Sequence, residues 1–452
     1  MIPTPVRISR TLVTVAALAA LAASPLLAQQ DTGKAVEQQG IRIGITYQPG
    51  VRPGMLVLGV GPNEVLDSIR TILARDLDYS DRFEMINLPG GDSLTIALAP
   101  HEQAQGGMFV NYGLYQALGA DFAVHVRAVT DSTVSITLYD VKGHGPRKEI
   151  TLGLPSMADP AFRMQVHRAS DEIVRAVTGT PGYAASRLLF VQENGRIYRI
   201  DADGAGQVAE TPAGVKTFSP AWGPNGREFA YTQFAGDNGA IYVQNAVTGE
   251  RRIVPPTANG LNYTPAFSPD GTTLAFTQSN GSGSDIYTYN VAKHCCLQRL
   301  TVGRFSDNLS PAYSPDGGRI AFVSTRAGLP QIYVMTSDGT NQELFAPFDY
   351  GVTGESHGPE WSPDGLHVTF HRDVAGSPQV FVMDVATRTV RQLTSTGRNE
   401  DPTWAPDGSH IAFVSNRTGA RQLWVIDLET GRVRQITRIG GTRLPAWSRR
   451  ID

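Results

Sequence analysis

The sequence predicts an α/β N-terminal domain followed by an all-β, six-bladed β-propeller whose ring is closed by the C-terminal strand. A short phrase, an aromatic residue followed by a turn of the Ser-Pro-Asp-Gly type, recurs every 43 to 48 residues. A period in this range with β-type content is typical of propellers. Only five residues follow Trp447, the aromatic of the last copy, so we expect strands that precede the first copy to complete the last blade. The repeat aromatics are Trp222, Phe267, Tyr313, Trp361, Trp404 and Trp447.

The first 28 residues are predicted to be a secretory signal peptide that is cleaved after Ala28. An apolar run, Leu12–Ala23, follows two arginines, which is the order found in such peptides. A retained membrane anchor is the alternative, but Pro25 and small residues interrupt a run that is already near the lower length limit for a span. We therefore expect an exported, soluble mature protein that does not span the membrane. Residues 29–40 are polar and Gln-rich and are predicted to form a flexible mature N-terminus.

Residues 41–178 are predicted to form a compact α/β domain, and residues 179–185 a linker. Leu66, Ile69 and Leu73 recur with the spacing of one helical face, whereas other segments alternate like strands. A glycine-rich stretch, Pro89–Gly107, is predicted to be a loop. The predicted elements, in order, are strands Ile41–Thr46 and Met55–Val60, helix Asn63–Leu77, strand Phe83–Ile86, helix Tyr112–Leu118, strands Phe122–Val129 and Thr133–Val141, and helix Phe162–Val177.

Residues 186–452 are predicted to form the propeller, with four strands in each blade. The repeat aromatic ends the first strand, and the following turn is specified by its residues: proline presets φ, aspartate bonds the local backbone, and glycine takes positive φ without steric cost. Arg187–Val191 and Arg196–Ile200 are predicted to be strands of the blade that the C-terminal strand completes. Closure of this kind removes exposed sheet edges, which otherwise invite aggregation.

Composition and cysteine content exclude some classes of function. The chain has 452 residues, of which 41% are hydrophobic, enough for two domains with a sizeable core. The net charge of −3 gives no support to nucleic-acid binding. Cys295 and Cys296 are adjacent, with Cα atoms about 3.8 Å apart, below the usual disulfide range. We favour ordinary loop residues; the alternatives are a vicinal disulfide and a metal site with His294.

Three sequence signals of catalysis or metal binding are each better explained by the propeller. Residues 354–358 match the nucleophile motif Gly-x-Ser-x-Gly. In hydrolases this motif lies at a sharp turn between a strand and a helix, whereas here it runs directly into the fourth copy of the repeat. His367 and His371 are spaced to face one way, but the position of His367 is occupied by Arg319 or His410 in other blades, which indicates an exposed position. Residues 201–204 resemble the start of a calcium loop without its remaining ligands. No catalytic residue, metal site or cofactor is predicted, and an axial cation is not predicted either.

The order of these parts resembles the TolB family, the periplasmic components of the Tol-Pal system. The resemblance runs from about Ile41 to the C-terminus, and its best local features are Val51–Pro53, Leu118–Asp121 and Phe218–Trp222, with residues 201–204 fitting the first blade. It implies a non-enzymatic periplasmic adaptor that supports outer-membrane integrity and invagination during cell division.

The resemblance also implies partners. The propeller would bind the lipoprotein Pal, the mature N-terminus would bind the inner-membrane protein TolA, and other outer-membrane proteins are further candidates. About twelve residues precede the first predicted strand, more than the family pattern has, which leaves the residues that contact TolA open. The candidate positions in this segment are Gln29, Gln30, Asp31, Lys34 and Glu37.

One position of the repeat varies while the scaffold around it stays uniform. This position lies four residues before each repeat aromatic and two before the proline that precedes it. The loops that carry it converge on one face of the ring. Side chains that differ from blade to blade there suit a surface that binds a partner. Apolar anchors can be desolvated while Glu400 and Arg443 set orientation; ordinary loop variation is the alternative. We expect Asn262, Asn308 and Asn399 to brace these loops. The six rim positions are Phe218, Tyr263, Leu309, His357, Glu400 and Arg443.

Two other classes of function are compatible with a secreted propeller. One is an enzyme that acts on a sugar or peptide at the pore, and the other is a generic cell-surface binding module. A propeller peptidase would also need a separate hydrolase domain of βαβ units, and neither end of the sequence has room for one.

Overall fold

The computed structural model describes residues 51–60, 63–88, 110–236, 238–254, 261–279, 281–303, 305–347 and 354–451. The predicted signal peptide, flexible N-terminus, first strand and glycine-rich loop lie outside these residues, as do the five N-terminal candidate positions. Within the described ranges, no helix is both long and apolar enough to cross a membrane.

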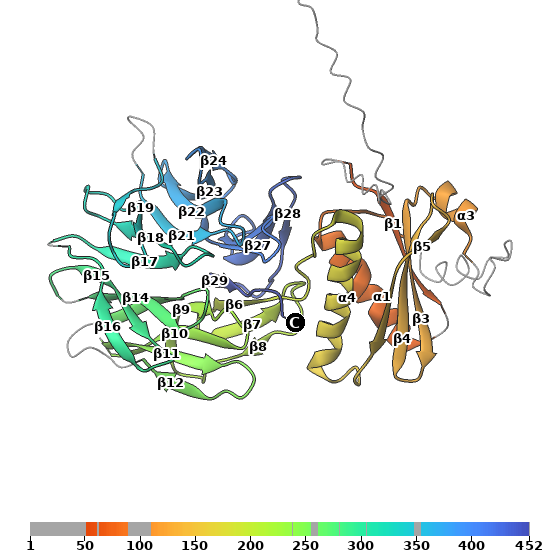
Figure 1. The fold of residues 1–452 in the computed structure, drawn as a ribbon, viewed down its shortest axis with the longest axis horizontal. Helices are drawn as coiled ribbons and strands as arrows, with labels where there is room; N and C mark the ends of the chain where they lie inside the picture. Colours follow the sequence, from red (N-terminus) through yellow and green to blue (C-terminus); the bar gives the residue numbers. More distant parts are fainter. Residues whose placement is uncertain are drawn as a thin grey trace, which may run out of the picture. The chain divides into compact units, whose positions relative to one another are not determined.

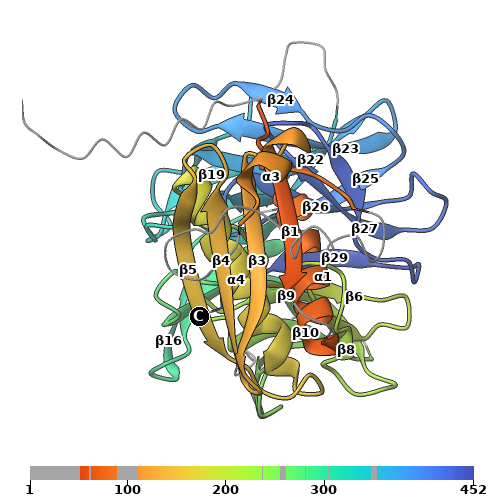
Figure 2. The ribbon, with the colours of Figure 1, turned by 90° about the vertical axis from the view of Figure 1, so that its right-hand side faces the viewer.

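The α/β domain is a five-stranded sheet with the order β2-β1-β3-β4-β5. Figure 2 shows β1, β3, β4 and β5 side by side. β1 pairs in parallel with β2 and β3, and the remaining pairs are antiparallel. The elements are β1 (Gly54–Val60), α1 (Glu64–Tyr79), β2 (Glu84–Met85), α3 (Tyr112–Ala117), β3 (Phe122–Thr130), β4 (Thr133–Asp140), β5 (Gly145–Gly153) and α4 (Pro160–Thr178).

Helices cover both faces of this sheet. Figure 1 shows α1 and α4 on one face and α3 on the other. The apolar stripe of α1 that the sequence predicted is buried against α4 and the sheet. Local residues fix the helix ends: the Asn63 side chain accepts a hydrogen bond from the Val65 N–H at 2.8 Å, and Gly179 ends α4 with φ of 88°, a conformation that glycine adopts at low cost.

The sequence analysis did not predict β5. This strand begins with Gly145 and Pro146 and continues with three charged residues, so it lacks an apolar alternation at its start. It lies at the edge of the sheet, where proline and charged side chains are tolerated and discourage pairing with other chains.

The propeller consists of six four-stranded antiparallel sheets, as predicted (Figure 1). We number the blades along the chain. Blade 1 is β9 (Lys216–Trp222), β10 (Glu228–Ala235), β11 (Asn238–Asn245) and β12 (Arg251–Ile253); blade 2 is β13 (Leu261–Phe267), β14 (Thr273–Ser279), β15 (Ser284–Asn290) and β16 (Cys295–Arg299); blade 3 is β17 (Asn308–Tyr313), β18 (Arg319–Ser324), β19 (Gln331–Thr336) and β20 (Glu343–Leu344). Blade 4 is β21 (Ser356–Trp361), β22 (His367–Val374), β23 (Ser377–Asp384) and β24 (Val390–Gln392); blade 5 is β25 (Asn399–Trp404), β26 (His410–Ser415), β27 (Gln422–Asp427) and β28 (Val433–Gln435); blade 6 is β29 (Arg443–Trp447), β6 (Arg187–Val191), β7 (Ile197–Asp201) and β8 (Val208–Ala209).

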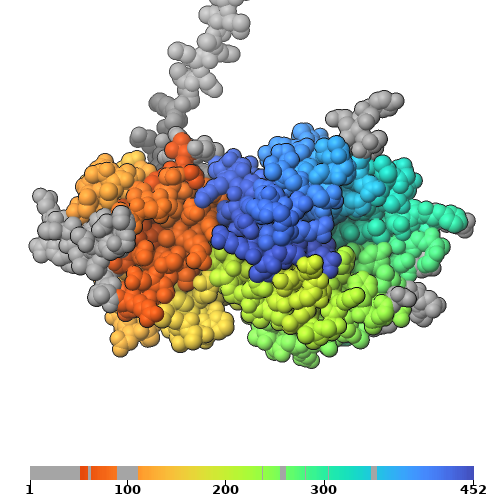
Figure 3. Space-filling view, turned by 180° about the vertical axis from the view of Figure 1, so that it is seen from behind, coloured from red at the N-terminus to blue at the C-terminus, as the bar shows by residue number. Residues whose placement is uncertain are grey.

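Blade 6 confirms the predicted closure of the ring. β29 pairs antiparallel with β6, with Trp447 opposite Leu188. The Trp447 indole Nε1–H donates to Ser186 Oγ at 2.8 Å, and the Arg187 N–H donates to Ser448 Oγ at 2.9 Å. In Figure 3 the blue C-terminal part of the chain accordingly lies against the yellow-green start of the propeller. The first and last parts of the propeller are therefore held together within one sheet.

The Ser-Pro-Asp-Gly turns are fixed by their own side chains. In blade 3, Ser314 Oγ donates to Asp316 Oδ1 at 2.5 Å, and the Gly318 N–H donates to the same oxygen at 3.0 Å. Gly317 has φ of 72°, which explains why this position is glycine. The turn is thus fixed by hydrogen bonds within the short segment from Ser314 to Arg319.

Buried charges join the α/β domain to blade 5. Asp81, just after α1, contacts the imidazole of His410 at 3.2 Å, the guanidinium of Arg434, and that of Arg432 at 3.0 Å. The other imidazole nitrogen of His410 bonds Asp407 at 2.6 Å. The side chains of Asp81 and His410 are fully buried. Since Asp81 is the carboxylate shared by these three cationic side chains, removing it would leave buried charges without a partner.

We expect this junction to weaken in alkaline solution. Burial alone would lower the pKa of His410, but the carboxylates of Asp407, Asp81 and Asp427 raise it from 6.5 to about 9. The protonated imidazole therefore stabilises the folded protein fully below pH 6.5, and this stabilisation is lost as the pH rises through 9. Thermal unfolding across this window should show a falling midpoint for the wild type and a flatter dependence for His410→Gln. Parallel curves for the two proteins would contradict this assignment.

Candidate functional site

Each blade carries the same backbone irregularity at the rim. The residue before the blade proline, one after each rim position, has φ between 46° and 61°, and the pairing of each inner strand shifts register there. Residues before proline normally stay extended, and a left-handed conformation costs on the order of 1–3 kcal/mol at a non-glycine residue. Such bulges redirect neighbouring side chains. The residues concerned are Ser219, Thr264, Ser310, Gly358, Asp401 and Leu444.

Hydrogen bonds between blades hold this strained backbone in place. The Ser310 N–H donates to Thr277 Oγ1 at 3.2 Å, the Asp401 N–H to His371 Nδ1 at 3.2 Å, and the Leu444 N–H to Asp401 Oδ2 at 3.1 Å. Each acceptor belongs to the preceding blade. In blades 3, 5 and 6 the bulge is therefore held by a hydrogen bond to the preceding blade.

The three rim positions of blades 1 to 3 form an apolar half, and all three are half-buried. Phe218 packs edge-to-face against Phe234 with ring centroids 6.3 Å apart. Tyr263 donates its hydroxyl to Ser284 Oγ at 3.0 Å, and Leu309 packs against the core between blades 3 and 4. These side chains keep part of their apolar surface in water, where a partner can cover it.

The loop that leads into β17 extends this apolar half. Phe305 is 95% exposed and Val302 is 75% exposed. Hydrogen bonds tie the loop to blade 3, because the Asp307 N–H donates to Thr325 Oγ1 at 2.8 Å and the Thr325 N–H donates to the Asp307 carbonyl at 3.0 Å. The sequence analysis did not single out Phe305 or Val302, and the signal that could have found them is an aromatic residue in an otherwise polar loop.

The rim positions of blades 4 to 6 form a charged half. His357 bonds Glu355 through Nε2 at 3.3 Å, and its ring stacks on that of His371 with centroids 5.6 Å apart. Burial lowers the pKa of His371 to about 3, with His357 and Arg398 acting in the same direction. His371 is therefore neutral, which agrees with its role as an acceptor from the Asp401 N–H.

Glu400 and Arg443 carry the charges of this half. Glu400 contacts Arg398 at 3.3 Å and Arg421 at 3.5 Å. The Nε atom of Arg443 is buried and has no hydrogen-bond partner among the described residues. The rim thus combines an apolar half and a charged half on one uniform scaffold.

The three asparagines expected to brace the rim loops are all buried and hydrogen-bonded. Asn262 Oδ1 accepts from Gln278 Nε2 at 2.9 Å, Asn308 Nδ2 donates to Asp285 Oδ1 at 3.0 Å, and Asn399 Nδ2 donates to Gln379 Oε1 at 2.7 Å. Equivalent positions in three blades thus hold the loop ends in place.

The Gly-x-Ser-x-Gly segment has the geometry of a strand. Ser356 opens β21 and is fully buried. Its hydroxyl donates to Gln331 Oε1 at 3.2 Å and accepts from Arg372 Nε at 2.9 Å. A nucleophile must be exposed on a strained turn, so this serine is a structural residue.

The expectation of an exposed position at His367 and its equivalents is wrong for His410. His367 is half-buried and lies over Trp404 with ring centroids 6.2 Å apart. His410 is fully buried because the α/β domain covers it. Arg319 is half-buried as well, so none of these three positions is exposed as the sequence suggested.

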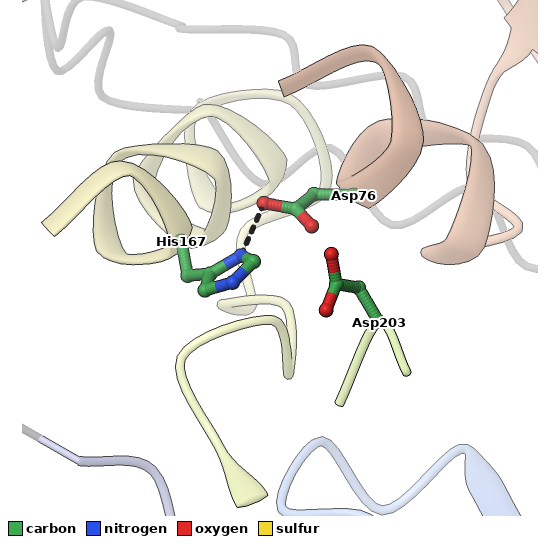
Figure 4. Close-up of side chains that lie close together, drawn as sticks. All are labelled: Asp76, His167 and Asp203. Carbon is green, nitrogen blue, oxygen red and sulfur yellow. Dashed lines mark hydrogen bonds and ion pairs between the residues drawn. The ribbon is translucent and has the colours of Figure 1, made fainter. Parts of the chain in front are cut away.

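Asp76, His167 and Asp203 form a buried cluster with metal-like spacing, drawn in Figure 4. However, His167 Nδ1 bonds Asp76 Oδ2 at 2.8 Å, and Asp203 is paired with Arg163 and with Arg75 at 3.0 Å. Cationic side chains already neutralise these carboxylates, so the cluster is an ion-pair network between α1, α4 and the turn after β7. The sequence segment that resembled a calcium loop belongs to this network.

Cys295 and Cys296 are joined in a vicinal disulfide at the start of β16. The preference for ordinary loop residues was therefore wrong, and the disulfide alternative holds. Within the part of the chain that the structure describes, the residues grouped closely enough to hold a metal do not include His294.

The comparisons with known proteins agree with this fold. The family model described as PD40, TolB beta propeller domain, matches residues 174–349 and 350–452, more than half of the chain. The Tol-Pal system protein TolB of Chromobacterium violaceum is 31% identical over 199 residues, which cover 43% of this chain and 44% of that protein. The protein of the same name from Methylococcus capsulatus is 35% identical over 224 residues, which cover 47% of this chain and 50% of that protein.

The chain spans about half the length of the curated relatives it matches. Among solved structures, the crystal structure of TolB from Acinetobacter baumannii matches with a TM-score of 0.74 at 24% identity, over 89% of this chain and 98% of that chain. This likeness concerns the fold.

Proposed function

Because the chain belongs to the TolB β-propeller family, we propose that it is a non-enzymatic adaptor of the Tol-Pal system in the periplasm. It binds the lipoprotein Pal at the outer membrane and peptidoglycan through the propeller rim, and the inner-membrane protein TolA through its mature N-terminus. This link serves outer-membrane integrity and invagination during cell division. Other outer-membrane proteins are further partners of the same rim.

The asymmetric rim is the observation that carries the proposal. The six blades repeat their scaffold residues, yet the rim positions divide into an apolar half and a charged half. Interfaces between proteins combine desolvated apolar anchors with charges that fix register and suppress wrong partners.

Replacing Tyr263 and His357 together by alanine should weaken Pal binding at least about tenfold, because one apolar anchor and one polar contact are lost from opposite halves of the rim. Both side chains are half-buried, so the ring should stay folded. Calorimetry measures the affinity, and circular dichroism checks the fold. Leu366→Ala is the matched control, since Leu366 is exposed in a Ser-Pro-Asp-Gly turn on the other face. Unchanged Pal affinity in the double variant would rule out this face.

Deleting residues 29–40 should abolish TolA binding and leave Pal binding unchanged. A flexible segment that orders on binding makes contacts independent of the rim. Pull-down with each partner separately measures the two interactions. Equal loss of both partners would refute the division of roles between the N-terminus and the rim.

A further inference from the structure

A second candidate site lies on the propeller face opposite the rim. A cavity of about 630 Å³ opens among the Ser-Pro-Asp-Gly turns, within the range of small-molecule sites. The six repeat aromatics and the turn prolines form most of its wall, and Pro181 and Gly182 of the linker complete it. Its charged residues are Glu360, Arg449 and Arg450.

Glu360 is the only charged residue at its position in the six repeats, and packing between the blades does not require its charge. Its Oε1 atom accepts hydrogen bonds from the Trp404 N–H and from Thr403 Oγ1, both at 3.1 Å. In the next blade, the neutral hydroxyl of Thr403 makes the equivalent bond to the Trp447 N–H at 3.1 Å. The bond between blades therefore needs an oxygen but no charge. The corresponding residues of the other blades are Ala221, Ala266, Ala312, Thr403 and Ala446.

The Glu360 carboxylate also lacks a counter-charge. Among the residues that the structure describes, no lysine, arginine or histidine contributes to the shift of its pKa. Burial raises its pKa to about 7, against the two hydrogen bonds that lower it. Glu360 is half-buried; a carboxylate removed from water without a counter-charge destabilises a protein, and in a concave site it indicates a function.

We propose that this cavity binds a ligand with a protonated amine at one end, paired with Glu360, and a carboxylate at the other, paired with Arg449. The half-buried rings of Trp222, Phe267 and Tyr313 provide apolar walls and cation–π contacts for the amine. Arg449 is exposed at the cavity, and it disfavours a ligand that carries only positive charge. A lysine-like amino acid or a peptide with such a side chain meets both requirements.

Titration calorimetry with Nα-acetyl-lysine, and with Nα-acetyl-norleucine as the ligand lacking the amine, tests this proposal. We expect the lysine derivative to bind at least about tenfold more tightly to the wild type. Glu360→Gln keeps the oxygen that bonds Trp404 and removes the charge, so it should lose this preference. Glu360→Ala, which introduces the residue of four other blades, should behave in the same way. Equal affinities in the wild type, an unchanged preference in Glu360→Gln, or no binding of either compound would overturn the proposal.

A second measurement separates ligand binding from a structural role. An acid with a raised pKa destabilises the folded state as the pH rises from 4.5 through 7. The unfolding midpoint of ligand-free Glu360→Gln at neutral pH should therefore equal or exceed that of the wild type. A clear decrease would show that the charge serves the scaffold, contrary to the proposal. Because Glu360 lies on the face opposite the rim, Glu360→Gln should leave Pal binding unchanged.

Discussion

Replacing Asp81 by alanine is expected to lower the free energy of unfolding by about 3 to 5 kcal/mol, the cost of removing one partner from a buried ion pair. Asp81 lies between His410, Arg434 and Arg432, and its side chain is fully buried. Burial would raise the pKa of Asp81, but His410 and Arg434 hold it at about 2. The variant leaves His410 and Arg434, which are both buried, without their shared carboxylate.

The neighbouring Asp78 provides the control for this prediction. It contacts Arg432 at 3.0 Å, but both side chains are more than a third exposed, so Asp78→Ala should cost about 1 kcal/mol or less. Urea unfolding followed by fluorescence and by circular dichroism measures both variants and shows whether the two probes coincide. Similar, small losses for Asp78→Ala and Asp81→Ala would contradict the assignment of the junction to Asp81.

Trp447→Ala is expected to cost a similar amount, about 3 to 5 kcal/mol, because it removes a large buried side chain. Trp447 is 7% exposed, packs edge-to-face against Tyr183 at 5.2 Å, and bonds Ser186. It therefore joins β29 to β6, the pair of strands that closes the ring. Trp447→Phe keeps most of the packing and loses the hydrogen bond, which should cost about 1 kcal/mol.

Trp222 is the matched control, since it occupies the same place in blade 1. It is half-buried, and its Nε1 has no partner within the described part of the chain. The strands of blade 1 are also consecutive in sequence, so Trp222→Ala should cost less and leave the ring closed. Limited proteolysis should cut Trp447→Ala near β6 and β29 first. Equal stability of the two variants would contradict the role of Trp447 in closure.

The propeller could be predicted because its signals are local. Proline, aspartate and glycine specify the turn within four residues, and the short tail after Trp447 leaves one way to complete the last blade. The rim positions could be found for a related reason: they differ between blades while their neighbours stay uniform. The bulge beside each rim position was not predicted, although the following proline marks its place.

The junction between the domains could not be predicted from the repeat. His410 occupies a position that is half-buried in blade 4 as His367, and it is Asp81, 329 residues away, that buries and pairs it. β5 was missed because an edge strand needs little apolar alternation. The importance of the Glu360 charge could not be predicted from the sequence, because only the structure shows that no basic side chain among the described residues pairs with it.

Amide hydrogen exchange with and without Pal tests the central claim, capture of a partner at the rim, most directly. Exchange reports which backbone segments a partner covers or stabilises. The account predicts slower exchange in the segments that carry the rim positions, residues 216–219, 261–264, 305–310, 354–358, 398–401 and 441–444, and unchanged exchange in the Ser-Pro-Asp-Gly turns. Slower exchange confined to those turns, or none in the propeller, would contradict it.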